Sequence, residues 1–84
     1  MDTDSAVAMR KLLDFLDRLE REKIWYRLEH IRDSIMVETA VPGERWEIEF
    51  FAGGHVEVER FVSVGKLGGE ELIEELFQIM VDDE

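Results

Sequence analysis

The apolar positions of the chain first follow a helical spacing. Within residues 5–22 they recur every three or four residues, which is one face of an amphipathic helix. Its predicted core face holds Met9, Leu12, Leu13, Leu16 and Leu19. Asp4 or Ser5 is a suitable N-cap, because a short polar side chain can accept a hydrogen bond from the first turn. The pattern predicts a helix over residues 5–22, with Val7 and Phe15 at the margins of its core face.

The spacing then changes to a period of two. Apolar and polar residues alternate, which is typical of strands in a sheet with one face in solvent. Turn signals at Asp33-Ser34, Pro42-Gly43 and Ala52-Gly53-Gly54 separate the alternating runs. Short connections of this kind predict a four-stranded antiparallel meander, with strands at residues 24–30, 35–41, 45–51 and 55–62.

A helical pattern returns near the C-terminus. Residues 65–69 read as a loop, and Glu70 and Glu71 then begin a second helix, where acidic side chains suit the positive end of the helix dipole. Its predicted apolar face holds Leu72, Ile73, Leu76, Phe77 and Met80. We expect one α+β domain over residues 1–84, a two-layer sandwich of order α-β-β-β-β-α with both helices on one face of the sheet.

The third and fourth predicted strands define a register. A three-residue loop between them pairs Phe50 with Val56 and Ile48 with Val58, so apolar residues meet apolar residues. A two-residue loop would instead place Phe50 opposite Glu57. We therefore predict the three-residue loop.

On the other face of the sheet, this register opposes acidic residues. Glu49 faces Glu57, Glu47 faces Glu59, and Glu38 on the neighbouring strand lies beside them. Directly opposed like charges destabilise a sheet by about 0.2–1 kcal/mol for each pair. Two interpretations remain open: the glutamates only keep this face solvated, with salt screening their repulsion, or they bind a cationic partner.

Apolar side chains share that acidic face. Trp25, Met36, Phe51 and Phe61 have the same parity as the glutamates, and such a cluster is typical of an interaction surface. The alternative to an interaction surface is that the N- or C-terminal segment covers part of this face. The candidate partner-binding residues are therefore Glu38, Glu47, Glu49, Glu57, Glu59, Trp25, Phe51 and Phe61.

Charge and composition limit the classes of function. The chain has 21 acidic and 10 basic residues, a net charge of −11, which argues against a nucleic-acid partner. It has no Cys, which excludes disulfides and thiolate metal sites. No apolar run is long enough for a membrane span, and the acidic first residues do not resemble a signal peptide. The two His residues show no spacing typical of nucleophilic catalysis or metal binding. We expect a cytoplasmic protein without catalytic activity, metal or cofactor.

Several segments are similar to known sequences. Ser34–Val37, Val41–Phe51 and Val56–Glu59 resemble a group of short, acidic, uncharacterised bacterial proteins, and that resemblance implies no activity. In size and acidity the chain also resembles, in type only, the immunity proteins and antitoxins that neutralise toxic domains. The opposed glutamates and the aromatic residues beside them predict a non-catalytic protein-interaction domain, most concretely an inhibitor that binds a basic protein surface, such as that of a toxin domain. A structural homodimer and a secretion-chaperone-like protein are the alternatives.

Overall fold

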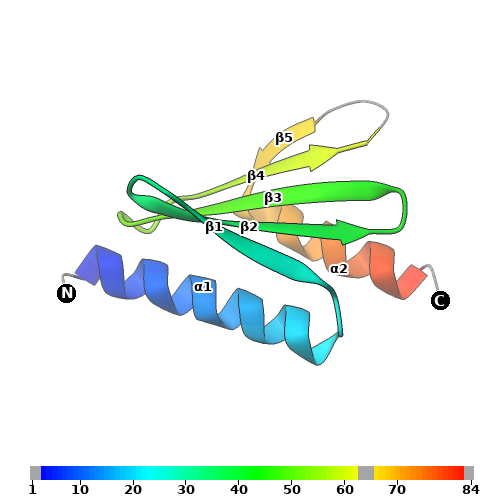
Figure 1. The fold of residues 1–84 in the computed structure, drawn as a ribbon, viewed down its shortest axis with the longest axis horizontal. Coiled ribbons are helices and arrows are strands. Elements are labelled where there is room, and N and C mark those ends of the chain that lie inside the picture. The colour runs from blue at the N-terminus through cyan, green and yellow to red at the C-terminus, as the bar shows by residue number, and fades with distance from the viewer. Residues whose placement is uncertain (1–2, 63–65, 83–84) are drawn as a thin grey trace.

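The fold is a five-stranded antiparallel sheet with two helices on one side (Figure 1). The structure is a computed structural model and describes residues 3–62 and 66–82. The sheet order is β1-β2-β3-β4-β5. The elements in chain order are α1 (Thr3–Arg21), β1 (Tyr26–Ile31), β2 (Ser34–Val41), β3 (Glu44–Phe51), β4 (Val56–Phe61), β5 (Lys66–Gly69), the 3₁₀ turn η1 (Glu70–Leu72) and α2 (Ile73–Asp82). The α+β class is confirmed.

The prediction of four strands was wrong, because β5 forms in the segment expected to be a loop. Glycine is depleted in strands, so the sequence of this segment gave no strand signal. Gly68 nevertheless pairs with Val58 of β4. A Cβ atom at Gly68 would lie 2.4 Å from Cδ1 of Leu72. A methyl group here would therefore force the side chain of Leu72 to move, since η1 packs directly onto the strand.

The hairpin registers follow from their turns. Phe50 lies opposite Val56 and Ile48 opposite Val58, which confirms the predicted three-residue loop between β3 and β4. The first turn differs from its prediction by one residue. Ser34 already belongs to β2 and is paired with Ile31 of β1, so the turn is Arg32-Asp33.

The predicted core face of α1 was partly wrong. The helix buries Ala8, Phe15 and Leu19 against the sheet, while Met9 and Leu13 are 45% and 52% exposed. The predicted members Leu12 and Leu16 are only partly buried at the edge of the core. The apolar stripe of α1 is therefore wider than the surface that the sheet covers.

Phe15 explains how α1 is oriented. Its ring centre lies 5.6 Å from that of Phe50 on β3 and 6.1 Å from that of Phe77 on α2. Tilted and edge-on aromatic pairs at such distances add to the free energy gained by burial. The helix turns its Phe15 side toward both neighbours, and its Leu13 side is left outside the core.

The segment predicted as a second helix from Glu70 is divided, because residues 70–72 form η1 and α2 begins at Ile73. Leu72 of η1 and Leu76 and Phe77 of α2 are buried and Ile73 is partly buried, as predicted, while the side chain of Met80 lies outside the described part. The other buried members of the core between the layers are Ile24, Val37, Val41, Trp46, Ile48, Phe50, Val56 and Val58.

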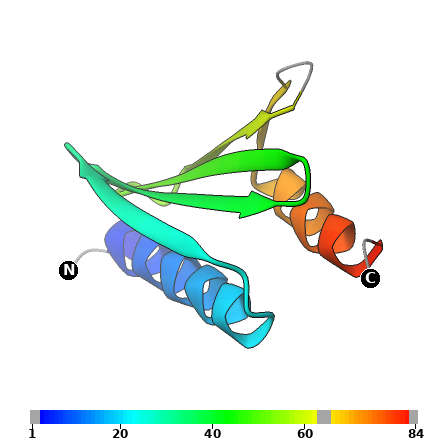
Figure 2. The same cartoon turned by 45° about the vertical axis from the view of Figure 1, so that its right-hand side comes forward.

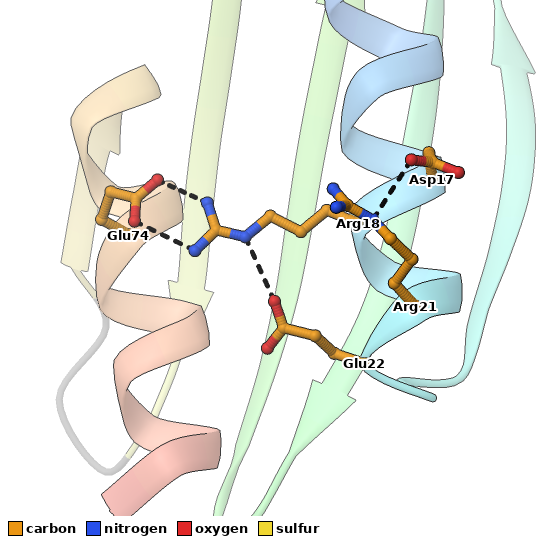
Figure 3. Close-up of polar contacts among 5 residues, drawn as sticks. All are labelled: Asp17, Arg18, Arg21, Glu22 and Glu74. Carbon is orange, nitrogen blue, oxygen red and sulfur yellow. Dashed lines mark hydrogen bonds and ion pairs between the residues drawn. The ribbon is translucent and has the colours of Figure 1, made fainter.

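One arginine connects the two helices (Figure 3). Arg18 of α1 donates from Nη1 and Nη2 to the two carboxylate oxygens of Glu74 on α2, at 2.6 and 3.1 Å, and from Nε to Glu22 at 3.2 Å. Its guanidinium carbon lies 3.9 Å from the centre of the Phe77 ring. The bond from Arg18 lowers the pKa of Glu74, because it favours the ionised carboxylate. This bidentate pair holds α1 beside α2.

Candidate protein-interaction face

The sheet face opposite the helices carries two rows of glutamates. None of the described helices or strands covers this face (Figure 2). In one row Glu38 of β2 lies opposite Glu47 of β3, which lies opposite Glu59 of β4. In the next row Glu49 of β3 lies opposite Glu57 of β4. The predicted opposition of like charges is confirmed, and Glu38 stands directly in the first row.

The two rows border a hollow on the outer face. Its volume is about 440 Å³, and four glutamates line it together with residues of β2, β4 and β5. Acidic residues that line a concave surface concentrate negative potential there. The lining residues are Met36, Glu47, Glu49, Glu57, Val58, Glu59 and Gly68.

Glu38 differs from the other glutamates, because its charge is matched within the chain. It accepts a hydrogen bond from Nε of Arg27 on β1, and Nε of Arg45 on β3 lies 3.8 Å from its second oxygen. Its side chain is only 13% exposed. Both arginines share the parity of the glutamates, which was the available signal for this pairing. The structure therefore places Glu38 in an ionic network of its own chain.

Glu47 and Glu59 are the least neutralised members of the first row. Glu47 lies 4.0 Å from Nη2 of Arg45, at the limit of an ion pair. Among the side chains that the structure describes, no cation pairs with Glu59. The negative charge of the row is therefore concentrated on β3 and β4.

The two glutamates of the second row interact with Ser34 and His55 instead of with Arg side chains. Glu49 accepts a hydrogen bond from Oγ of Ser34 at 2.6 Å. Glu57 lies 3.0 Å from Nε2 of His55, and both side chains are largely exposed. A hydroxyl donor leaves the charge of a carboxylate in place, so Glu49 stays available to a cation. Among the described residues, no group of three or more His, Asp or Glu side chains is arranged so that it could hold a metal ion.

Two of the predicted aromatic residues flank the rows at opposite ends. Phe61 of β4 is half-buried, and the guanidinium carbon of Arg45 lies 4.3 Å from its ring centre. Phe51 of β3 is also half-buried, with its ring centre 5.4 Å from that of His55. The structure thus brings the acidic rows and these two rings together on β3 and β4.

Trp25 lies apart from that group. It precedes β1 by one residue, is 61% exposed, and its carbonyl oxygen accepts a hydrogen bond from Oγ1 of Thr39 at 2.6 Å. Strands β2 and β3 separate β1 from β4 in the sheet. Of the predicted partner-binding residues, Trp25 and Glu38 therefore lie toward β1, and the other six lie on β3 and β4.

Neither described helix is long and apolar enough to cross a membrane. Comparison of the chain with protein-family models, with curated proteins and with solved structures finds no match. The function must therefore be argued from the chemistry of the site itself.

Proposed function

We propose that the chain is a non-catalytic protein-interaction domain whose outer sheet face binds a basic protein surface. The observation that carries this proposal is that four glutamates, Glu47, Glu49, Glu57 and Glu59, line one hollow. Opposed like charges cost stability that a neutral polar face would not lose. A cationic partner would relieve this repulsion on binding.

The flanking aromatic rings suit such a face. Aromatic side chains are enriched among the residues that contribute most to protein–protein binding energy. Phe51 and Phe61 would contact apolar parts of the partner, while the glutamates between them meet its Lys and Arg side chains. Complementary charge accelerates encounter, so association would be fast at low salt and slower at high salt.

The most concrete form of this function is an immunity- or antitoxin-like inhibitor of a basic toxin domain. Small size, high acidity and an uncovered acidic face support it. This narrower form predicts that a gene beside that of the chain encodes a basic toxin domain, and that co-expression of the chain restores growth. A neighbouring toxin that remains lethal in the presence of the chain would contradict it.

The broader function can be tested with a defined probe. The ¹⁵N-labelled chain would be titrated with a short Lys- and Arg-rich peptide containing one Trp, and the backbone amide shifts followed by NMR. We expect the largest shifts on β3 and β4, around Glu47, Glu49, Glu57 and Glu59. Glu70, Glu71 and Glu75 provide an internal control, because they are acidic and exposed but lie on η1 and α2. Equal or larger shifts at these three residues would contradict the proposal.

A further inference from the structure

β1 is an edge strand of the sheet, and no described strand pairs with its outer side. A two-residue turn, Arg32-Asp33, makes Ile31 and Ser34 the hydrogen-bonded closing pair of the hairpin. Because bonding directions alternate along a strand, the odd residues of β1 bond to β2. The carbonyl of Trp25, which accepts from Thr39 of β2, agrees with this direction. The backbone groups that face the open edge belong to Tyr26, Leu28 and His30.

Exposed apolar side chains gather near the same edge. Of the side chains that the structure describes, the large apolar ones that are clearly exposed all lie on α1 or between residues 25 and 28. Leu28 is 50% exposed, although it shares the helix-side face of the sheet with Val37. On α1 the exposed residues include Met9 and Leu13.

The polar contacts of α1 show which way Met9 and Leu13 face. Lys11 and Arg18 form ion pairs with Glu70 and Glu74, so they mark the side toward η1 and α2. Glu20 accepts a hydrogen bond from the hydroxyl of Tyr26 on β1, at 2.6 Å, and marks the opposite side. Met9, Leu13 and Glu20 follow one stripe of the helix at spacings of four and seven residues. Met9 and Leu13 therefore face the β1 side.

A hollow lies between this part of α1 and the β1–β2 hairpin. Its volume is about 290 Å³, and Met9, Leu12, His30 and Ile35 are among the residues that line it. An open strand edge, a half-exposed Leu28 and this hollow, which His30 of β1 lines, make up one candidate surface on this part of the described chain. We name it the β1 edge surface.

We propose that the β1 edge surface binds a second copy of the chain, so that two β1 strands pair antiparallel about a twofold axis. The two sheets would join into one of ten strands, since each copy contributes five. Both α1 helices would lie on the same side of that sheet, with Met9 and Leu13 of each copy near the axis. Symmetric dimers with self-complementary patches are the commonest oligomers, and pairing removes an exposed edge.

The charges on β1 select one register. With Leu28 opposite Leu28 of the second copy, Arg27 lies opposite Glu29 of the second copy, and the symmetry repeats this pair. The two neighbouring registers would place Arg27 opposite Arg27, or Glu29 opposite Glu29. Opposite charges across strands stabilise pairing and like charges destabilise it. The selected register also pairs Tyr26 with His30, so all three residues with outward backbone groups form hydrogen-bonded pairs.

The distribution of charge permits this contact despite the net charge of the chain. Residues 1–43, which contain α1, β1 and β2, hold nine acidic and seven basic residues. The excess of acid lies in residues 44–84, on the strands and helix farther from β1. Salt screens exposed charges beyond about 8 Å at physiological ionic strength, so these distal acids repel weakly across the dimer. Edge pairing leaves the outer glutamate face open, so this inference is independent of the proposed function.

The test uses two charge-reversed variants and their mixture. In the dimer of the Arg27→Glu variant, the new acidic side chain would lie opposite Glu29 of the other copy at two symmetric places. In the dimer of the Glu29→Arg variant, the new basic side chain would lie opposite Arg27 of the other copy at the same two places. We expect each variant to dimerise at least about tenfold more weakly than the wild type in sedimentation experiments. An equimolar mixture of the two variants restores both opposite-charge pairs. It should form a heterodimer that native mass spectrometry detects.

The controls separate this effect from folding and net charge. Arg10→Glu and Asp14→Arg make the same reversals at exposed positions of α1 and should leave dimerisation unchanged. Arg27 also bonds to Glu38, so its variant is checked by thermal unfolding. Glu29 lies opposite Met36, and its variant loses no ion pair within the hairpin. A monomeric wild type at about 0.1 mM would overturn the proposal, and so would variants that dimerise normally or a mixture that fails to form the heterodimer.

Discussion

The two edges of the sheet are built in contrasting ways. The β1 edge belongs to a nearly neutral half of the chain, is six residues long, and contains the exposed Leu28. The β5 edge is four residues long, contains two glycines and has η1 packed against it. Short edge strands resist pairing with other chains. The difference indicates that one edge is protected and the other is suited to association.

The acidic residues are also unevenly distributed between the β1 side and the β5 side of the sheet. Residues 44–84 hold twelve acidic and three basic residues, and four of these acids meet at the outer hollow. Near β1, by contrast, Arg27 and Arg45 neutralise Glu38. One sheet can therefore provide an edge for a like partner and a face for an oppositely charged one.

The largest expected effect concerns the two sides of α1. Phe15→Ala removes a buried ring that contacts Phe50 and Phe77, and should lower the free energy of unfolding by about 3–4 kcal/mol. Leu13→Ala on the exposed side should change it by less than about 0.5 kcal/mol under conditions where the chain is monomeric. Urea unfolding of both variants measures the difference, and equal losses would contradict the orientation of α1.

The protected edge depends on Gly68. Gly68→Ala should cost about 1–3 kcal/mol, because its methyl group would overlap the side chain of Leu72. Gly53→Ala is the matched control, since nothing lies within 4 Å of a Cβ at Gly53. Denaturant midpoints of the two variants that do not differ would show that η1 does not pack on β5 as described.

The link between the helices should be sensitive to acid. The bond from Arg18 lowers the pKa of Glu74, so the ionised carboxylate stabilises the fold above the pKa of the unfolded chain. That stabilisation should be lost as the pH falls through the lower, folded pKa. Unfolding measured between pH 6 and pH 3 should therefore show a smaller acid-dependent loss for Glu74→Gln than for the wild type. An identical pH dependence would count against the bond.

The smallest expected effects are changes in the free energy of unfolding, which should have opposite signs for two sets of glutamates on the outer face. Replacing Glu47 and Glu59 by Gln removes a like-charge repulsion and should stabilise the chain by about 0.2–1 kcal/mol at low salt. Glu38→Gln should instead destabilise it by a similar amount, because Glu38 pairs with Arg27 and Arg45. Thermal unfolding at low and high salt distinguishes them, and the same sign for both variants would contradict the described charge pattern.

Much of the sheet could be predicted from the sequence, because its two faces differ chemically. Alternation along β3 and β4 leaves one register that keeps Ile48 and Phe50 on the apolar side, and the opposed glutamates follow from it. β5 could not be predicted, since its two glycines give no alternating pattern and the contact of Gly68 with Leu72 is not visible in the sequence. The orientation of α1 could not be predicted either, because Leu13 belongs to the same apolar stripe as the buried residues.

The sequence could predict where the glutamates of the candidate site lie, but not which of them is neutralised by a neighbouring Arg. Parity placed all five glutamates on one face, but the state of Glu38 depends on which strands lie beside β2. Arg27 comes from β1 and Arg45 from β3, so both hairpin registers are needed to bring them to one carboxylate. Pair interactions of this kind depend on tertiary neighbours and are not visible in a single strand.

The most direct test of the acidic face compares two variants of equal net charge. Glu47→Gln/Glu59→Gln removes two charges at the hollow, and Asp4→Asn/Asp14→Asn removes two exposed charges on α1. The association rate of the Lys- and Arg-rich peptide would be measured by stopped-flow fluorescence of its Trp at low salt. We expect the first variant to bind the peptide several-fold more slowly than the second, because local potential steers the encounter. Equal rates for the two variants would show that net charge alone attracts the peptide, and would contradict the proposed role of the outer face.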